Sequence, residues 1–391
     1  RPFFSRRIGL ASPVIGGARL SGKLGSNYRL GIMSMQTDAN GETPASNFTV
    51  ATLQRKILTR SSLSVFLVNK ESGLQDNSDG SDNSYNQVSG IDFNLASVDN
   101  LWTGKAFFHQ AIYKNAGDNA FAAATSIKYN TGTVSAHMGY SFVGSDFQAD
   151  VGFVKRIGFH RFGSDLEFKF YPEEGNILNH GPAFKFYNVL DENFNTTDRE
   201  FELKYMINWL DRSKLSAELE RGFVKLLAPF DPTNTSGDTL AAGSEYNWNE
   251  LSLDYVSDAR KTLNFNSNIR YGGYYNGNKL SLNGTINYRV QPYVNLSIST
   301  TYDKIDLPDP FEDVAFLLIG PRLDLTFTNK LFFTTFVQYN DQADNVNVNL
   351  RFQWRFAPVS DLFIVYTNNS YPDDFRTKDN ALVAKISYWF N

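Results

Sequence analysis

Residues 346–356 read VNVNLRFQWRF, in which apolar and polar side chains alternate without interruption. In an extended strand, successive side chains point to opposite faces. The stretch therefore has an apolar face, from Val346 to Phe356, and a polar face that carries Asn347, Arg351 and Arg355. Its length suits a tilted strand that crosses a bilayer, which needs about 9–11 residues. We interpret it as a membrane-spanning β-strand.

The same alternation recurs along the chain. It is found at 201–209 (FELKYMINW), 263–271 (LNFNSNIRY), 280–288 (LSLNGTINY) and 294–302 (VNLSISTTY). Tyr or Phe recurs near the ends of the apolar parity, as the interfacial girdles of membrane barrels require. A soluble all-β protein is the alternative, but its strands cluster nearer 5–6 residues. The repeated pattern predicts a transmembrane antiparallel β-barrel of the bacterial outer membrane.

Composition excludes several other classes. The most apolar stretch, 315–319, is far shorter than the roughly 20 residues of a spanning helix. The chain has no Cys, which removes disulfides and thiolate metal sites. Its net charge of −4 gives no basic footprint for nucleic acid, so no nucleic-acid partner is expected.

Connections of two lengths separate the alternating runs. Short ones fall at 25–27, 130–132, 291–292 and 328–330, and long polar ones at 71–86, 222–245, 303–313 and 368–380. Outer-membrane barrels have short periplasmic turns and longer outer loops. We count roughly 20–22 strands, and the even-number rule slightly favours 22. Strand ends are least distinct between residues 142 and 183. The acidic stretch 76–83 matches a calcium loop poorly, because Gln75 and Asn86 would stand where carboxylates are wanted.

The last run ends the chain on an apolar, aromatic parity. This parity consists of Leu382, Ala384, Ile386, Tyr388 and Phe390. Such a terminal strand resembles the signal that barrel-assembly machinery uses for insertion. We therefore expect that machinery, outer-membrane lipid and lipopolysaccharide among the partners, with other outer-membrane proteins or lipoproteins as further candidates.

Several blocks of sequence resemble a family of outer-membrane barrels that has no settled activity. They are residues 1–9 (RPFFSRRIG), 15–18 with 22–23, 47–50 (NFTV), 151–156 (VGFVKR), 349–354 and 360–366. Members usually carry a family-nine-like carbohydrate-binding β-sandwich before the barrel, and a spacer between the RPFF and SRRIG blocks. Here Phe4 abuts Ser5. We expect residues 1–12 to be a lead-in from a periplasmic domain and residues 13–391 to form the barrel.

The polar parity supplies candidates for a lumen wall. These are Asp165, Glu167, Lys169, Glu202, Lys204, Glu218, Glu220, Arg270, Arg289, Arg351, Arg355 and Lys385. A barrel of this strand number is wide enough for a channel or a plugged lumen. Charged walls then select solutes at constrictions. The simpler interpretation is that these charges pair across strands.

Catalysis has little support in the sequence. The four histidines are His109, His137, His160 and His180, of which His109 and His137 fall on the polar parity; the simpler interpretation is that all four are lumen or loop residues. None stands in a triad or HExxH spacing, so no enzyme, cofactor or metal is expected. The leading hypothesis is a non-enzymatic channel or transport component, handling glycans or other nutrients. A structural or assembly subunit with a blocked lumen is the alternative, and a barrel hydrolase using His109 or His137 is the third hypothesis.

Overall fold

The computed structural model of the chain describes residues 1–41, 43–73 and 85–390. The acidic stretch 76–83 and Asn391 lie outside the described residues. A short 3-10 helix, η1 (Ser5–Arg7), precedes the strands. The strands are β1 (Val14–Leu24), β2 (Tyr28–Thr37), β3 (Ser46–Ile57), β4 (Ser61–Ser72), β5 (Tyr85–Ala96), β6 (Trp102–Tyr113), β7 (Phe121–Asn130), β8 (Val134–Val143), β9 (Phe159–Phe168), β10 (Ile177–Asp191), β11 (Thr196–Trp209), β12 (Lys214–Lys225), β13 (Glu245–Val256), β14 (Leu263–Tyr274), β15 (Gly277–Val290), β16 (Val294–Asp306), β17 (Val314–Thr328), β18 (Leu331–Asn340), β19 (Asn345–Ala357), β20 (Ser360–Ser370) and β21 (Thr377–Ser387).

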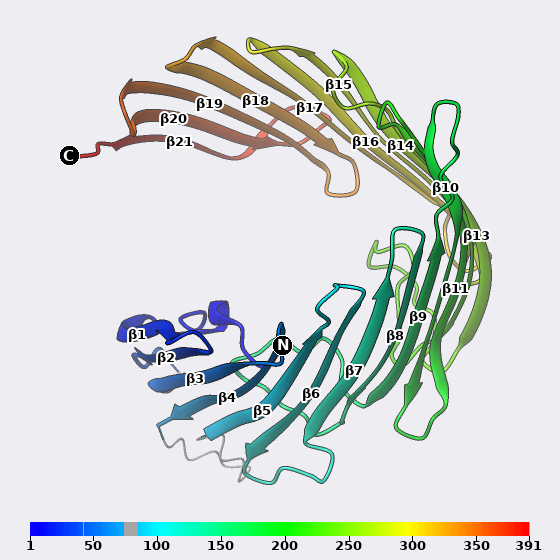
Figure 1. Ribbon diagram of the computed structural model, residues 1–391. Coiled ribbons are helices and arrows are strands. Elements are labelled where there is room, and N and C mark those ends of the chain that lie inside the picture. Colours follow the sequence, from blue (N-terminus) through cyan, green and yellow to red (C-terminus); the bar gives the residue numbers. More distant parts are fainter. Residues whose placement is uncertain (42, 74–84, 391) are drawn as a thin grey trace. The chain divides into compact units, whose positions relative to one another are not determined.

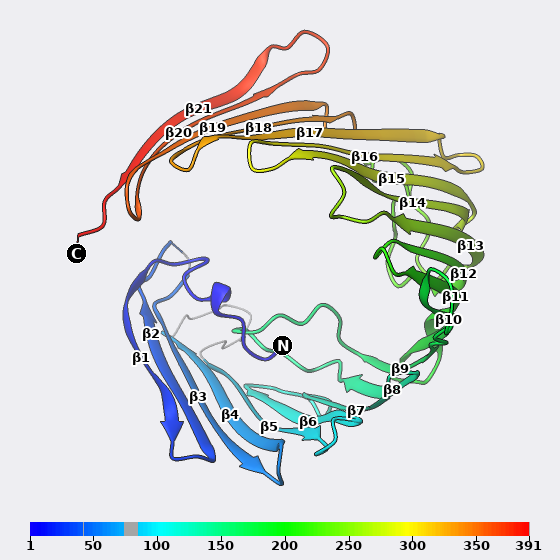
Figure 2. The ribbon, with the colours of Figure 1, turned by 45° about the horizontal axis from the view of Figure 1, so that its top comes forward.

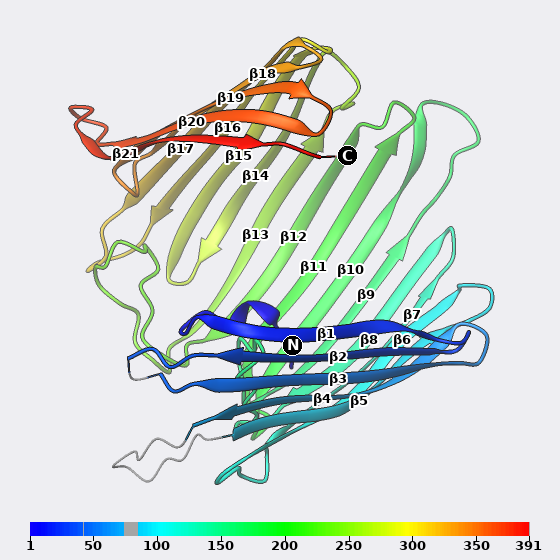
Figure 3. The same cartoon turned by 90° about the vertical axis from the view of Figure 1, so that its left-hand side faces the viewer.

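The chain divides into two compact units. Unit 1 comprises Arg1–Phe168 and Phe184–Glu200, and unit 2 comprises Lys169–Ala183 and Phe201–Asn391. In unit 1, each strand from β1 to β9 pairs antiparallel with the next along the chain (Figure 1). In unit 2, strands β12 to β21 pair in the same consecutive way, and Figure 3 shows β13–β21 side by side.

The described residues contain 21 strands, which belong to one sheet. This confirms the predicted all-β fold and the predicted range of 20–22 strands. The count of described strands lies between 20 and 22, the two even numbers that the sequence favoured. All of these strands have 10–15 residues, which is enough for a tilted transmembrane strand of about 9–11 residues. Within the described residues, no helix is long and apolar enough to cross a membrane.

The predicted apolar parity is exposed rather than buried in a core. Trp354, Ile386 and Tyr388 are 46%, 71% and 57% exposed. Across β14, Leu263, Phe265, Ile269 and Tyr271 are exposed likewise. A water-soluble protein would bury such side chains, because each contributes about 1.5–3 kcal/mol when it leaves water. These exposed side chains give the strands a face suited to lipid, which we call the apolar face.

The opposite, polar face is tied together by side-chain hydrogen bonds between strands. The Asn268 amide donates to the Asp254 carboxylate over 2.8 Å, and Asn283 donates to the Asn268 oxygen over 3.4 Å. Asn347 on β19 donates to Asn369 on β20 over 2.8 Å. Polar groups removed from bulk water need such partners. The alternation read from the sequence therefore corresponds to two chemically different faces.

Candidate functional site

Two segments of unit 1 are not part of the strands and lie on the polar face of β2–β7. One is the connection between β8 and β9, residues 144–158, and the other comprises residues 1–12 with η1 (Figure 2). We call the first the inward segment and the second the N-terminal segment. The inward segment falls within the stretch where the sequence left strand ends indistinct.

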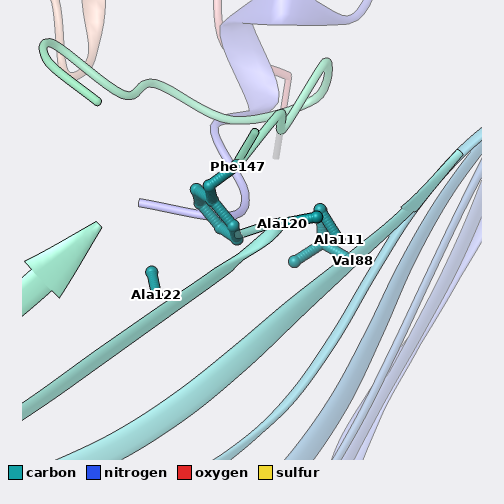
Figure 4. Close-up of a cluster of buried hydrophobic side chains, with 5 residues drawn as sticks. All are labelled: Val88, Ala111, Ala120, Ala122 and Phe147. Atoms are coloured by element: carbon teal, nitrogen blue, oxygen red, sulfur yellow. The ribbon is translucent and has the colours of Figure 1, made fainter. Parts of the chain in front are cut away.

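Apolar contacts anchor the inward segment to the wall. Phe147 packs in a buried cluster with Val88, Ala111 and Ala120, as Figure 4 shows. Val151 packs with Phe48 and Val68 in a second buried cluster. Buried apolar side chains of this size each stabilise the packed state by about 1.5–3 kcal/mol. The strands thus carry apolar side chains on their otherwise polar face at the place where the inward segment covers it.

Polar contacts surround these clusters. The Lys70 ammonium lies 2.9 Å from the Asp150 carboxylate. Asn86 on β5 binds the segment twice, because its amide donates to the Gln148 carbonyl oxygen over 3.2 Å and its oxygen accepts from the Asp150 amide over 3.0 Å. Buried peptide groups of the segment thereby gain partners that solvent would otherwise supply.

The two ends of the inward segment are pinned to β10 and β11. The Ser145 amide donates to the Glu192 carboxylate over 2.8 Å, just beyond β10. At the other end, the Arg156 guanidinium donates to the Asp198 carboxylate over 2.6 Å and to the Thr197 hydroxyl over 2.7 Å. A charge-assisted pair of this kind is stronger than a neutral hydrogen bond. Residues 146–155 therefore form a flap between two fixed points.

The N-terminal segment pairs with the flap. The Phe4 amide donates to the Val151 carbonyl oxygen over 2.7 Å, and the Phe153 amide donates to the Arg1 carbonyl oxygen over 2.9 Å. A Cβ atom placed on Gly152 would lie 2.4 Å from that Arg1 oxygen, so this close approach requires glycine. Three blocks that carry the family resemblance, at 1–9, 47–50 and 151–156, meet at this point.

Of the predicted wall residues, Asp165 and Glu167 belong to unit 1. Asp165 on β9 is 2.8 Å from the Nδ1 atom of His137 on β8, directly opposite it in the register. His109 is buried 3.4 Å from Asp92, which also pairs with Lys105 at 3.6 Å. Glu167 is half-buried on the same strand as Asp165.

In unit 2 the structure pairs most of the predicted charges. Lys204 and Glu218, both predicted, lie 3.0 Å apart on β11 and β12. The other pairs are Arg270 with Glu250 at 3.1 Å, Arg355 with Asp361 at 3.2 Å, Arg351 with Gln353 at 2.9 Å, and Arg289 with the Ala259 carbonyl oxygen. Lys169, Glu202 and Glu220 are half-buried, and Lys385 is exposed. Each residue's role in selecting solutes stays a prediction.

Two histidines differ from their interpretation as lumen or loop residues. The Nδ1 atom of His160 lies 2.7 Å from the Tyr140 hydroxyl, and that of His180 lies 2.6 Å from the Tyr205 hydroxyl. Both tyrosines stand on the apolar parity of their strands. A ring nitrogen on this face needs a hydrogen-bond partner from the protein itself, and the tyrosine hydroxyl supplies that partner.

The terminal apolar parity is exposed, as its sequence suggests. Strand β21 ends at Ser387, and Tyr388 follows with its ring stacked on Phe356 at 6.3 Å. Phe390 meets Tyr388 edge-on at 4.6 Å. The use of these residues as an insertion signal stays a prediction.

Sequence reasoning did not find the inward segment's anchors, Lys70, Asp150, Arg156 and Asp198. A signal was present: Val68, Val88 and Ala111 place apolar side chains on the polar parity of three successive strands. Such a patch on a wall that faces water predicts a covering segment.

Comparisons with known proteins agree with this architecture. The model of the domain of unknown function DUF5916 matches residues 32–332. No curated protein sequence matches the chain. Among solved structures, the ferric enterobactin receptor PfeA of Pseudomonas aeruginosa aligns with a TM-score of 0.51 and 10% identity, covering 89% of this chain and 72% of that chain. The copper transporter OprC aligns with a TM-score of 0.51 and 10% identity, covering 95% of this chain and 77% of that chain.

At this level of identity the likeness concerns the fold, which is that of outer-membrane receptor barrels. The predicted fold is therefore confirmed, and the predicted location, the bacterial outer membrane, is where this fold occurs. The match to the family model spans well over half of the sequence, and the chain therefore belongs to the DUF5916 family.

Proposed function

We propose that the chain is a non-enzymatic transport component of the outer membrane, and that the polar face of unit 1 lines a route which the flap restricts. The observation that carries this proposal is the flap itself, held on the polar face by non-covalent contacts between two pinned ends. A wall segment that only filled space would not need separate pins at its ends. The transport receptors of similar fold are consistent with this role.

The strength of the contacts suits a displaceable flap. The Lys70 and Asp150 side chains are 26% and 19% exposed, so solvent screens part of their attraction. The flap contributes one buried side chain to each apolar cluster, Phe147 and Val151, and its Ala149 and Val154 pack partly buried against the first cluster. Local opening therefore costs far less than unfolding the strands.

The proposed cargo is a nutrient-sized solute, with glycans as one class. The division into a lead-in at residues 1–12 and a barrel at residues 13–391 belongs to this proposal. The carbohydrate-binding sandwich that the family resemblance implies is likewise a proposal about the larger protein.

A reversible crosslink tests the proposal, because the chain has no native cysteine. Lys70→Cys with Asp150→Cys, bridged by a short bis-thiosulfonate, would lock the flap; reductant would release it. We expect lower ion current in planar bilayers, or slower solute entry into liposomes, in the locked state than in the released state. The matched control bridges Lys204→Cys and Glu218→Cys, a pair 3.0 Å apart within the wall. This bridge should leave the current unchanged.

The alternative is a structural or assembly subunit, which the covered polar face of unit 1 also favours. It predicts no current in either state. It also predicts stable co-purification of other outer-membrane proteins or lipoproteins. An absent current in the locked and the released protein alike would overturn the transport proposal.

A further inference from the structure

A cavity of about 410 Å³ opens on the polar face of unit 1, between β6 and β10. Its lining includes Lys105, Gly139, Arg161, Gly163, Lys185 and Tyr187. The volume falls within the range of small-molecule sites, about 300–1,000 Å³. Flap residues are not among the described lining, although Phe107 both lines the cavity and packs against the cluster that contains Phe147.

The cavity is hollow because two glycines face each other in its wall. Gly139 on β8 stands opposite Gly163 on β9 in the register. A Cβ atom on Gly163 would meet its nearest neighbour at 4.0 Å, and one on Gly139 would lie 3.4 Å from Ser126. Packing therefore does not require glycine at either position. Glycine inside a strand costs stability and often marks a place where a ligand approaches the backbone closely.

Two of the cationic side chains that line the cavity are paired with carboxylates. Lys105 pairs with Asp92 at 3.6 Å, and Lys185 pairs with Glu200 at 3.1 Å. Glu200 also accepts a hydrogen bond from the Tyr187 hydroxyl over 2.8 Å. The Asp165 carboxylate in the lining is engaged by His137 at 2.8 Å.

Arg161 is the cation without such a partner. Its guanidinium carbon lies 5.0 Å from the centre of the Tyr187 ring. Among the residues that the structure describes, Arg161 forms no ion pair, and it is exposed to the cavity. Stacking on Tyr187 orients the planar guanidinium, and this group matches carboxylates and phosphates in a bidentate way.

We propose that this cavity binds a small organic anion, whose carboxylate or phosphate lies on Arg161 while its remaining atoms occupy the hollow above Gly139 and Gly163. The inference deepens the transport proposal by naming the solute class, and it rests on that proposal only for the solute's passage. Carboxylates already pair with Lys105 and Lys185, so the positive charge of Arg161 is what attracts an anion, and a neutral molecule of equal size binds less well.

Titration calorimetry on the detergent-solubilised full chain tests the inference with three probes of similar size: D-glucuronate, D-glucose 6-phosphate and D-glucose. We expect at least one anion to bind and glucose to bind at least tenfold more weakly. Arg161→Gln should weaken anion binding at least tenfold, and Arg161→Lys should restore part of it. Gly163→Phe fills the hollow and should abolish binding. The matched control, Arg351→Gln, changes another arginine of a polar face and should leave binding unchanged.

Equal binding of glucose and both anions, or no binding of any probe, would overturn the inference. Unchanged anion affinity in a folded Arg161→Gln protein would also overturn it. Heat-modifiable migration in gels shows whether each variant is folded. The calorimetric result does not depend on conduction: anion binding with no current removes the transport proposal alone, and a current without anion binding removes this inference alone.

Discussion

The ammonium group of Lys70 on β4 lies 2.9 Å from the carboxylate of Asp150, 80 residues further along the chain. This ion pair joins a strand of the wall to the flap, beside the buried contacts of Phe147 and Val151. The pair holds the flap on the otherwise polar face of the strands. The stability of the flap can therefore be changed without altering the strands.

The first prediction concerns Gly152→Val. A side chain at this position would meet the Arg1 carbonyl oxygen, and overpacking of this kind costs about 1–3 kcal/mol. We expect the population of the open flap to rise at least roughly tenfold, because about 1.4 kcal/mol changes an equilibrium constant tenfold. Faster tryptic cleavage after Lys155 would report this opening. Gly22→Val is the control, because nothing lies within 4 Å of its Cβ position. Equal cleavage in the two variants would count against the flap.

The second prediction compares neighbouring residues on opposite faces of β15. Leu282 stands on the apolar face and Asn283 on the polar face. An arginine on the lipid face costs about 2–4 kcal/mol at the bilayer midplane, whereas polar walls tolerate charge. We expect Leu282→Arg to lower the free energy of unfolding in lipid bilayers more than Asn283→Arg does. Denaturant titration in liposomes measures both. The reverse order would contradict the assignment of faces.

A third prediction concerns the long connection between β12 and β13. Asp231 accepts hydrogen bonds from the Thr233 hydroxyl at 2.7 Å and from backbone amides of Thr233, Thr235 and Ser236 at 2.8–2.9 Å. The Thr233 hydroxyl is the largest of the causes that lower the pKa of Asp231 from 3.8 to about 2. Because the folded pKa is depressed, the stabilisation is complete above the unfolded pKa and is lost as pH falls from about 4 to 2.

Pepsin, which works in this pH window, measures that loss. We expect the connection in the unmodified protein to resist cleavage near Phe230 and Leu240 at pH 4 and to become susceptible near pH 2. Asp231→Asn should be cleaved at pH 4 already, because its neutral side chain accepts these hydrogen bonds weakly. A denatured substrate corrects for the change of pepsin activity with pH. Equal resistance of both proteins at pH 4 would refute the role of the carboxylate.

The fourth prediction concerns the terminal aromatics. Tyr388 and Phe390 are exposed at the end of β21, where assembly machinery would meet the chain. We expect Phe390→Ser to slow insertion into liposomes that contain the barrel-assembly machinery, and to leave slow spontaneous insertion into detergent unchanged. Phe375→Ser, which changes an exposed aromatic before β21, is the control. Equal slowing in both settings would indicate a folding defect instead.

Much of the fold could be predicted from local pattern. The runs at 263–271, 280–288 and 346–356 lie within β14, β15 and β19, with the expected faces. The stretch 142–183 could not be divided correctly, because residues 144–158 form neither a strand nor a simple outer loop. Lys204 and Glu218 both lie on the predicted polar parity, but only the structure shows that they form an ion pair with each other.

The sequence by itself determined which side chains face lipid and which face water, because in each strand that choice follows from a two-residue period of the backbone. Tertiary structure alone decided that the flap and the N-terminal segment lie on the wall, and that Arg161 is left over beside facing glycines. Those arrangements depend on registers and contacts between residues far apart in the chain, and a local periodicity cannot predict them.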